Sequence, residues 1–335
     1  MDTQRLILFA VFSFSLLLLW DAWQAKDLPP PTAQPSAQQP AGSSVPVASA
    51  PAQPAATPTT QDKSLTAGAR AVVETDVMRV EIDANGGDLR KLVFKGYHEV
   101  DHADRQLVLL QDAPGKPYVA QSGFTVFNGQ QGWLPTHKAV FNLAAGTYRL
   151  EGDAIRIPLT WQNPQTGIAV EKTYTFRRGS YQIEVSEKIS NTGAQPVQLE
   201  TYGQFVRHGQ PPAGESKFLY TFTGPAVYTE AAKFQKIKFE DVADGEAEFE
   251  KSAKDGWVAM LQHHFVAAWL PKSGLERSYY AEKLSDDLYS AGFKQPHGQL
   301  AAGQSITLDS RLYVGPQIQK NLEAAAPGLD LTRDY

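Results

Sequence analysis

The sequence predicts a mainly β protein: one large antiparallel sandwich or barrel, with one N-terminal transmembrane helix before it and a short C-terminal helix after it. Apolar and polar residues alternate with a period of two in VMRVEID, TYTFRR and YQIEVSEKIS, and turns containing glycine separate such stretches. This alternation is typical of half-buried strands. A repeat of about 20–50 residues is absent, and so is an alternation of strands with long helices, which disfavours solenoids, propellers and parallel α/β folds.

The N-terminal helix is predicted from LILFAVFSFSLLLLW, residues Leu6 to Trp20, which carries no charge. The segment from Arg5 to Trp23 would be about 28 Å long as a helix, close to the roughly 30 Å thickness of bilayer hydrocarbon. Arg5 suits one interface, and Trp20 and Trp23 suit the other. A positive charge on a very short tail favours a cytoplasmic N-terminus and an exported body. A cleavable signal peptide or a buried helix are the alternatives.

Four segments are expected. The anchor covers residues 1–26, and a Pro/Ala-rich disordered linker covers residues 27–66. The β body follows over residues 67–314, and an amphipathic connector covers residues 315–335. Between Leu28 and Gln61 the linker has nine prolines and no charged or aromatic residue. Such a composition cannot bury enough apolar surface to offset its ordering entropy. A plain tether is therefore expected, with a proline-rich partner motif as the alternative.

Charge and cysteine content exclude several classes of function. A net charge of −5 and a pI near 5.8 leave no basic stripe for nucleic acid. The absence of cysteine excludes disulfides, thiolate catalysis and zinc–thiolate sites. Dinucleotide-binding, P-loop, nucleophile-elbow and His-Glu-x-x-His motifs are also absent. The residues therefore indicate no cofactor, no metal site and no catalytic group.

Histidines are the remaining candidates for chemistry, and the sequence has seven: His98, His102, His137, His208, His263, His264 and His297. Adjacent residues of a strand point to opposite faces, so we expect one of His263 and His264 inside the sandwich and the other in solvent. Catalysis would need a carboxylate or second histidine placed by the fold. His264 and Trp269 are the candidates for a ligand-binding cleft, and a structural role is the alternative.

Two further features have structural interpretations. The stretch FEDVADGEAEFEKSAKD, Phe239 to Asp255, lacks the spacing of an EF-hand, so an exposed hairpin or solvated face is expected, with calcium binding as the alternative. The four tryptophans of the body are expected to fill the core rather than to form a sugar platform. They are Trp133, Trp161, Trp257 and Trp269.

The closing stretch, LYVGPQIQKNLEAAAPGLDLTRDY, changes from a strand pattern to a helical one. Pro316 is expected to break the last strand and start a helix. Ile318, Leu322 and Ala325 fall at helical spacing and form a narrow apolar stripe. The stripe either docks on the sandwich or belongs to a connector that lies close to the bilayer. The connector residues singled out are Gly315, Pro316, Ile318, Leu322 and Leu329.

The opening MDTQRLILFAVFSFSLLLLWDAW, the proline-rich tether, GWVAMLQHHFVAAWLP and the closing stretch occur in an order that resembles the YidC membrane protein insertase family of Gram-negative bacteria. The ending, from Leu-Tyr-x-Gly-Pro to Asp-Tyr, is the most specific motif, and the resemblance covers the whole chain. It implies a bacterial inner-membrane protein with its N-terminus in the cytoplasm. Its main domain would be a periplasmic β-supersandwich similar to sugar mutarotases.

The resemblance also implies a non-enzymatic role in the insertion, folding and assembly of inner-membrane proteins, alone or with the Sec translocon. The implied partners are inner-membrane lipids, Sec translocon components and nascent membrane proteins. In the family, the Asp-Tyr ending leads into further transmembrane helices, which carry the insertase activity. Because no such helix follows Tyr335, we expect a fragment that supplies the anchor and the periplasmic domain.

An exported, membrane-tethered carbohydrate-binding or aldose-epimerase-like sandwich is the alternative function. Such an epimerase needs a general base and a general acid on opposite sides of a sugar ring. His208, His264 and Glu171 are of suitable type, but no spacing in the sequence places them in one cleft. Similarity of fold alone does not decide function.

Overall fold

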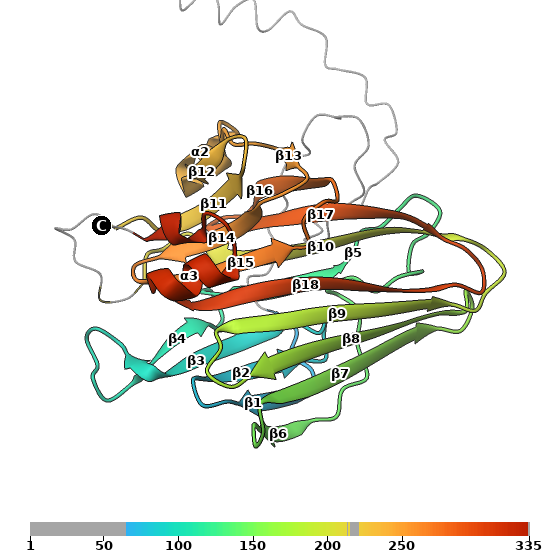
Figure 1. The fold of residues 1–335 in the computed structure, drawn as a ribbon, viewed down its shortest axis with the longest axis horizontal. Helices are drawn as coiled ribbons and strands as arrows, with labels where there is room; N and C mark the ends of the chain where they lie inside the picture. The colour runs from blue at the N-terminus through green and yellow to red at the C-terminus, as the bar shows by residue number, and fades with distance from the viewer. Residues whose placement is uncertain (1–64, 213, 215–220, 334–335) are drawn as a thin grey trace, which may run out of the picture. The chain divides into compact units, whose positions relative to one another are not determined.

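The computed structural model describes residues 65–212, 214 and 221–333. Within these residues the chain forms two β-sheets that pack face to face (Figure 1). The predicted anchor with Arg5, Leu6, Trp20 and Trp23 lies outside this part of the chain, as do nearly all of the linker and Tyr335. Among the described residues, no helix is both long enough and apolar enough to cross a bilayer.

The larger sheet has ten strands, which are antiparallel except for the parallel pair β1 and β6. In spatial order they are β13 (Ser252–Ala253), β16 (Arg277–Ser285), β17 (Leu288–Leu300), β10 (Val197–His208), β5 (Tyr118–Phe124), β3 (Leu89–His98), β2 (Met78–Asp83), β1 (Arg70–Glu74) and β6 (Gly146–Arg149), while β4 (Gln106–Leu110) branches from β3. The turn between β2 and β3 contains Gly86 and Gly87, whose positive φ values of 76° and 62° favour glycine.

The smaller sheet has eight antiparallel strands. In spatial order they are β12 (Lys233–Lys236), β11 (Gly224–Thr229), β14 (Trp257–Gln262), β15 (Phe265–Pro271), β18 (Ser305–Pro316), β9 (Gln182–Asn191), β8 (Ile168–Arg177) and β7 (Ala154–Asn163). Three short helical segments complete the described part: α2 (Phe239–Asp244), α3 (Gln319–Ala325) and the 3-10 helix η1 (Leu329–Thr332).

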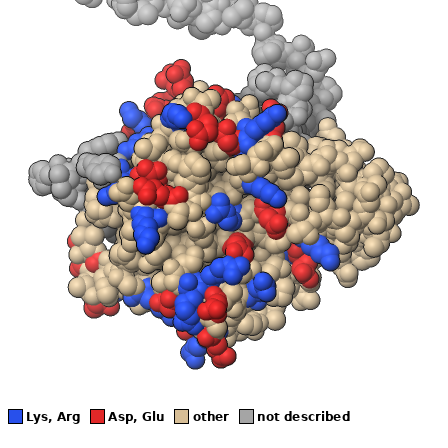
Figure 2. All heavy atoms as spheres, in the orientation of Figure 1, with Lys and Arg blue, Asp and Glu red and all other residues tan. Residues whose placement is uncertain are grey.

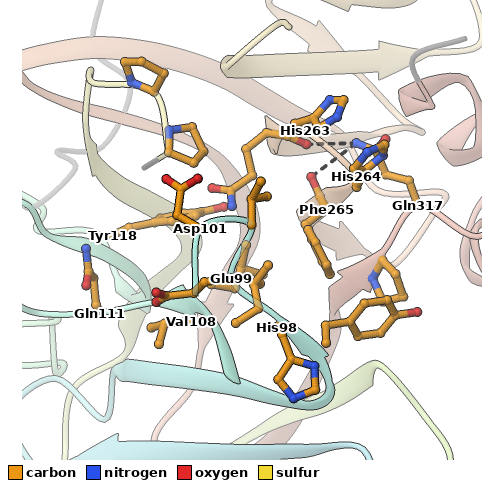
Figure 3. A pocket seen from close by; sticks show the side chains of 18 of the residues that line it. His98, Glu99, Asp101, Val108, Gln111, Tyr118, His263, His264, Phe265 and Gln317 are labelled. Atoms are coloured by element: carbon orange, nitrogen blue, oxygen red, sulfur yellow. Dashed lines mark hydrogen bonds between the residues drawn. The ribbon is translucent and has the colours of Figure 1, made fainter. Parts of the chain in front are cut away.

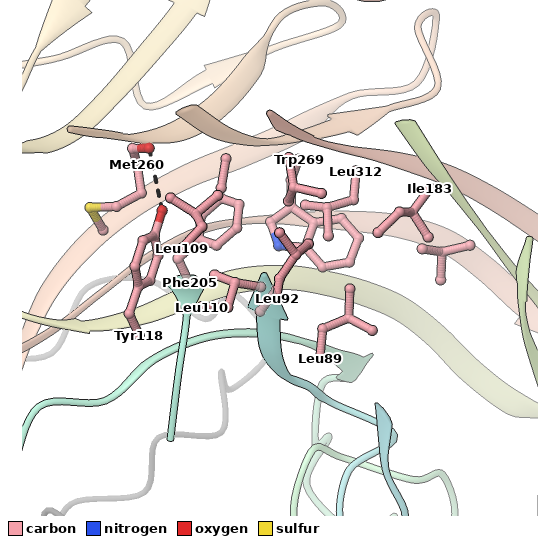
Figure 4. Packing of buried hydrophobic residues seen from close by; sticks show 14 of the residues in the cluster. Leu89, Leu92, Leu109, Leu110, Tyr118, Ile183, Phe205, Met260, Trp269 and Leu312 are labelled. Carbon is pink, nitrogen blue, oxygen red and sulfur yellow. Dashed lines mark hydrogen bonds between the residues drawn. The ribbon is translucent and has the colours of Figure 1, made fainter. Parts of the chain in front are cut away.

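A single large hydrophobic cluster fills the space between the sheets (Figure 4). Leu89 and Leu92 of the larger sheet lie in this cluster with Ile183, Trp269 and Leu312 of the smaller one, and each is no more than 1% exposed. Burial alternates along β9 as its sequence predicted, because every second side chain points into the cluster. The mainly β fold is therefore confirmed, and it is a sandwich rather than a barrel.

Strands β14 and β15 are buried on both faces, which explains why their sequence is a continuous apolar run. Met260, Ala267 and Trp269 face the core between the sheets. The alternate residues, among them Ala259 and Ala268, belong to a second cluster on the outer face of the smaller sheet. The C-terminal segment covers the part of this outer face that β11, β14, β15 and β18 form (Figure 1).

The C-terminal segment, residues 317–333, docks on the sandwich through α3 and η1. Leu322 and Leu329 are fully buried in the outer cluster, whereas Ile318 is 43% exposed. The indole Nε1 of Trp257 donates to the carbonyl oxygen of Pro327 at 2.9 Å and fixes the turn between the two helices. The short C-terminal helix is confirmed, although it begins at Gln319 because β18 continues through Pro316.

The stretch from Phe239 to Asp255 was expected to be an exposed hairpin or a solvated face. The prediction of a hairpin was wrong. Its first six residues form α2, which ends at Gly245 in the left-handed conformation. Phe239, Val242 and Phe249 are buried in the main core. The acidic residues of this stretch are spaced by apolar residues that pack inward, and this spacing is helical at its start.

The tryptophans divide into two pairs. Trp257 and Trp269 are each 1% exposed and fill the two clusters as expected. Trp133 and Trp161 are only partly buried and pack at the margins of the core.

On the face of the molecule drawn in Figure 2, acidic and basic side chains are intermixed and no stripe of one sign is visible. That face offers no electrostatic track for nucleic acid.

His137 lies in the sandwich interior and is 5% exposed. Its Nδ1 is 2.7 Å from the hydroxyl oxygen of Tyr202. Burial, together with the nearby cations Lys138, Arg90 and Lys172, lowers the pKa of His137 to about 3. Between pH 6.5 and pH 3 the unfolded chain therefore binds a proton at this residue that the folded chain does not.

We expect the contribution of His137 to stability to be complete above pH 6.5 and to decline as the pH falls towards 3, by about 1.4 kcal/mol per pH unit at its steepest. Urea unfolding of the wild type and His137→Gln at pH 7.5, 6, 5 and 4 measures this slope. The difference between the two proteins should shrink as the pH falls. His102→Gln, at an exposed position, is the control and should leave the profile unchanged. A constant difference between wild type and His137→Gln would contradict the assignment.

Candidate functional site

A cavity of about 820 Å³ opens where the β3–β4 hairpin leaves the larger sheet (Figure 3). β3 pairs with β5 only at Leu89 and Ala120, and further along it pairs with β4 instead, up to His98 and Gln106. The hairpin therefore diverges from β5 and β10 and leaves a gap in the sheet. The volume lies within the range of about 300–1,000 Å³ that is usual for ligand sites.

Five chain segments line this cavity, which we call the hairpin cleft. They are residues 97–111 of the hairpin, Lys116 and Tyr118 before and within β5, Arg207 to Pro212 at the end of β10, Gln262 to Phe265 at the β14–β15 turn, and Pro316 to Ile318 with Arg333 of the C-terminal segment. Apart from the first two, these segments are far apart in the sequence. The cleft is therefore a product of the tertiary fold rather than of one motif.

Five of the seven histidines line the hairpin cleft: His98, His102, His208, His263 and His264. The expectation that His263 and His264 point to opposite faces of a strand was wrong. Both residues lie in the two-residue turn between β14 and β15, where His264 has a φ of 64°, and their ring centroids are 3.5 Å apart. A turn does not impose the alternation of a strand.

The C-terminal segment holds this turn in place. The side-chain amide of Gln317 donates to the carbonyl oxygens of Gln262 and Phe265 at 3.3 and 3.2 Å (Figure 3). The backbone N–H of Gln317 donates to the carbonyl oxygen of His264 at 2.8 Å. The geometry of the turn at His263 and His264, which we call the histidine turn, is therefore coupled to the position of the C-terminal segment.

The deep end of the hairpin cleft is polar. The guanidinium of Arg207 lies 5.1 Å from the ring centroid of Tyr118 and donates to the carbonyl oxygen of His208 at 3.1 Å. Burial, reinforced by Arg207, lowers the pKa of His208 to about 4, so the ring is neutral at pH 7. Burial also raises the pKa of the Tyr118 hydroxyl, which donates to the carbonyl oxygen of Met260 at 3.4 Å.

The hairpin cleft also has apolar groups in its lining. Tyr97 and Phe265 pack edge to face with ring centroids 5.3 Å apart. Val100 and Ile318, which also line the cleft, are 76% and 43% exposed and are two of the five large hydrophobic side chains exposed in the described part of the chain. Glu99 and Asp101 lie among them (Figure 3). Buried polar groups and partly exposed apolar groups in one lining suit an elongated ligand that carries apolar groups.

The two cleft candidates from the sequence are not brought together. His264 lines the hairpin cleft, whereas Trp269 is buried in the core, where its indole Nε1 donates to the carbonyl oxygen of Gln204 at 3.1 Å. Trp269 borders a separate void of only about 20 Å³, together with Glu187 and His297. That void has room for about one water molecule and cannot admit a sugar.

The three residues of suitable type for an epimerase are also divided between two sites. His208 and His264 line the hairpin cleft, but Glu171 lines a different groove of about 670 Å³ on the smaller sheet. Among the described residues, no group of three or more histidine, aspartate and glutamate side chains is placed to hold a metal ion. The structure therefore places Glu171 outside the hairpin cleft that the two histidines line.

Comparison with known proteins identifies the family. The sequence model described as the YidC periplasmic domain matches residues 70–335. A protein of Thiobacillus denitrificans named membrane protein insertase YidC is 55% identical over 338 residues, and one of the same name from Methylobacillus flagellatus is 44% identical over 344 residues. Each alignment covers the whole of this chain, which spans 61% of the length of each relative.

Solved structures give a weaker match. A galactose mutarotase-related enzyme of Lactobacillus acidophilus superposes with a TM-score of 0.45 at 12% identity, over 73% of this chain and 97% of the other. A putative aldose 1-epimerase of Escherichia coli superposes with a TM-score of 0.42 at 12% identity, over 74% of this chain and 99% of the other. The two-sheet architecture therefore rests on the strand pairing described above. The match over residues 70–335 and the end-to-end relatives show that the chain belongs to the YidC periplasmic domain family.

Proposed function

We propose that this chain supplies the anchor and the periplasmic domain of a membrane protein insertase, which acts in the insertion, folding and assembly of inner-membrane proteins. The observation that carries the proposal is the end-to-end alignment with relatives named membrane protein insertase YidC at 55% and 44% identity. Because the chain spans 61% of their length, the activity belongs to the complete protein. The role of the described domain is to bind partners rather than to catalyse a reaction.

The proposed partners are nascent membrane proteins, components of the Sec translocon and inner-membrane lipids. The hairpin cleft supports a binding role, because its lining includes the exposed apolar side chains of Val100 and Ile318 and its volume of about 820 Å³ is sufficient for a chain segment. The N-terminus is proposed to lie in the cytoplasm, with Arg5 at the inner interface and the domain in the periplasm.

Depletion of the full-length protein tests the proposed function. We expect uninserted precursors of small inner-membrane proteins to accumulate several-fold in depleted cells, because insertion into the bilayer loses the protein that assists it. Protease accessibility of a newly made membrane protein measures insertion, and a secreted protein without a membrane span is the control. Unchanged insertion after depletion would refute the proposal. An accelerated exchange of aldose anomers by the purified full chain would favour the epimerase-like alternative instead.

The connector is proposed to lie close to the bilayer surface. Leu322 and Leu329 are buried in the outer cluster, so the apolar side chains of this segment that remain available to lipid are Ile318 and Leu331, which are 43% and 46% exposed. Nitroxide labels at these two positions should be broadened by lipid-soluble relaxation agents in the reconstituted full chain. Labels that respond only to water-soluble agents would place the connector away from the membrane.

A further inference from the structure

Edge strands need protection, because their unpaired N–H and C=O groups can pair with another chain. The sheets of the described part have four terminal strands, β13, β6, β12 and β7, and one branch strand, β4. β4 pairs with β3, and on its other side only Gln111, just beyond its end, bridges to Tyr118 of β5. Within the described ranges, therefore, no strand pairs with this other edge of β4 over residues 106–110, and we call it the free edge.

The four terminal strands each carry a protective feature. β13 has only two residues, β12 begins and ends with lysine, β7 contains Arg156 and Pro158, and β6 ends in Arg149. Short length, charge and proline are the usual means of blocking an edge. β4 reads QLVLL and has neither a charge nor a proline. An unprotected apolar edge is retained in natural proteins chiefly where it is covered or used.

The free edge of β4 lies in the wall of the hairpin cleft. Leu107, Val108 and Leu109, three consecutive residues, all line the cavity of about 820 Å³. In an antiparallel pair, alternate residues direct their N–H and C=O groups towards the partner strand and the others direct them away. Some main-chain groups of β4 therefore point away from β3, on the side where the cavity lies.

The chemistry of this wall selects an extended polypeptide. A row of main-chain donors and acceptors is complemented in full only by the main chain of another strand, which a lipid chain cannot supply. The apolar lining, including Tyr97, Phe265 and the exposed Val100, suits apolar side chains on every second residue of that strand. The cations Lys116, Arg207 and Arg333 and the carboxylates Glu99 and Asp101 give the lining both signs of charge.

We propose that the hairpin cleft binds an extended apolar peptide segment, which adds to the free edge of β4 as a further strand. The proposal rests on the proposed function for the source of the peptide, which would be a client protein. The binding itself is a property of the described domain and is measured without an insertion assay, so either proposal can fail alone.

The test uses the full chain reconstituted in nanodiscs and a fluorescent ten-residue peptide of alternating leucine and threonine. The matched probe is the same peptide N-methylated at every residue, which keeps its side chains and loses its main-chain donors. We expect the first peptide to bind and the second to bind at least about tenfold more weakly, because strand addition depends on main-chain hydrogen bonds. Hydrogen exchange should slow in β4 and not in β7.

Variants locate the site. Leu107→Lys puts a charge on the free edge and should weaken peptide binding at least about tenfold, while Thr160→Lys on the edge of β7 should not change it. Thermal unfolding of both variants shows whether each remains folded, and exchange in β4 of the wild type tests the site independently of them. No binding, equal binding of the two peptides, or protection outside β4 would each overturn the proposal. Equal binding would point to a lipid-like mode of occupancy.

Discussion

Replacing Lys172 by methionine is expected to lower the free energy of unfolding by about 3–5 kcal/mol. The side chain is fully buried, and its Nζ donates to the carbonyl oxygen of Ser122 at 3.1 Å and to the hydroxyl of the same residue at 3.0 Å. It also lies 3.5 Å from Oε1 of Glu187, which is buried as well. Removal of the cation leaves this carboxylate in a dry interior without its compensating charge.

The same pair explains the protonation behaviour of the glutamate. Burial raises the pKa of Glu187, and the nearby Lys172 opposes that rise. Without the lysine only the effect of burial remains, so Glu187 of Lys172→Met should take up a proton at a higher pH than in the wild type. The loss of stability should accordingly be smaller at pH 5 than at pH 7.5.

Urea unfolding followed by tryptophan fluorescence measures these differences. Lys188→Met is the matched control, because Lys188 follows Glu187 on β9 but is exposed, and its effect should stay within about 0.5 kcal/mol. The double variant Lys172→Met/Glu187→Leu should recover most of the loss, since replacing both members of a buried pair by apolar groups is often nearly neutral. A single variant as stable as the control would show that the pair is not maintained in solution.

This ion pair could have been predicted from the sequence. In IAVEKTYTFR the alternation that puts Val170 and Tyr174 in the core also puts Lys172 there. In the next strand, Glu187 shares the inward face of Val185. β8 and β9 are joined by a short turn, and their register places Lys172 opposite Glu187. Opposite charges at inward positions of adjacent strands are a recognisable signal for a buried cross-strand pair.

The hairpin cleft could not have been predicted in the same way. Its walls come from segments as distant as His98 and Gln317. The cleft exists because β3 pairs with β5 at its start and with β4 further along. No local pattern records that exchange. The histidine turn was misplaced for a related reason: the run from Val258 to Leu270 is apolar on both faces, so its period of two is hidden and the turn at His263 and His264 has no apolar-to-polar boundary.

Leu329→Ala, combined with Leu322→Ala, should release the C-terminal segment from the outer face of the smaller sheet. Both side chains are fully buried in the outer cluster, and a buried leucine truncated to alanine typically costs about 2–5 kcal/mol. The segment lies at the surface and makes no strand pairs, so much of this cost should appear as local detachment rather than as global unfolding.

Trp257 reports on that detachment directly. Its ring is 1% exposed and stacks on Tyr228 at 5.6 Å, and its indole N–H is held by the carbonyl of Pro327. Release of the segment should shift tryptophan emission to longer wavelength and make the Trp257 indole accessible to acrylamide. Because Gln317 makes three hydrogen bonds to the turn at His263 and His264, this turn should gain mobility as well.

A glycine next to this contact provides a second route to the same state. Gly328 has a φ of 72°, and a Cβ built on it would lie 2.3 Å from the ring of Tyr228. Gly328→Ala is therefore expected to displace the segment without removing any apolar side chain. Ile318→Ala and Leu331→Ala, at exposed positions, are the controls and should leave the emission of Trp257 unchanged and stability within about 0.5 kcal/mol. If the double leucine variant and Gly328→Ala both keep the emission of the wild type, the segment does not depend on this docking, and the buried positions of Leu322 and Leu329 do not describe the protein in solution.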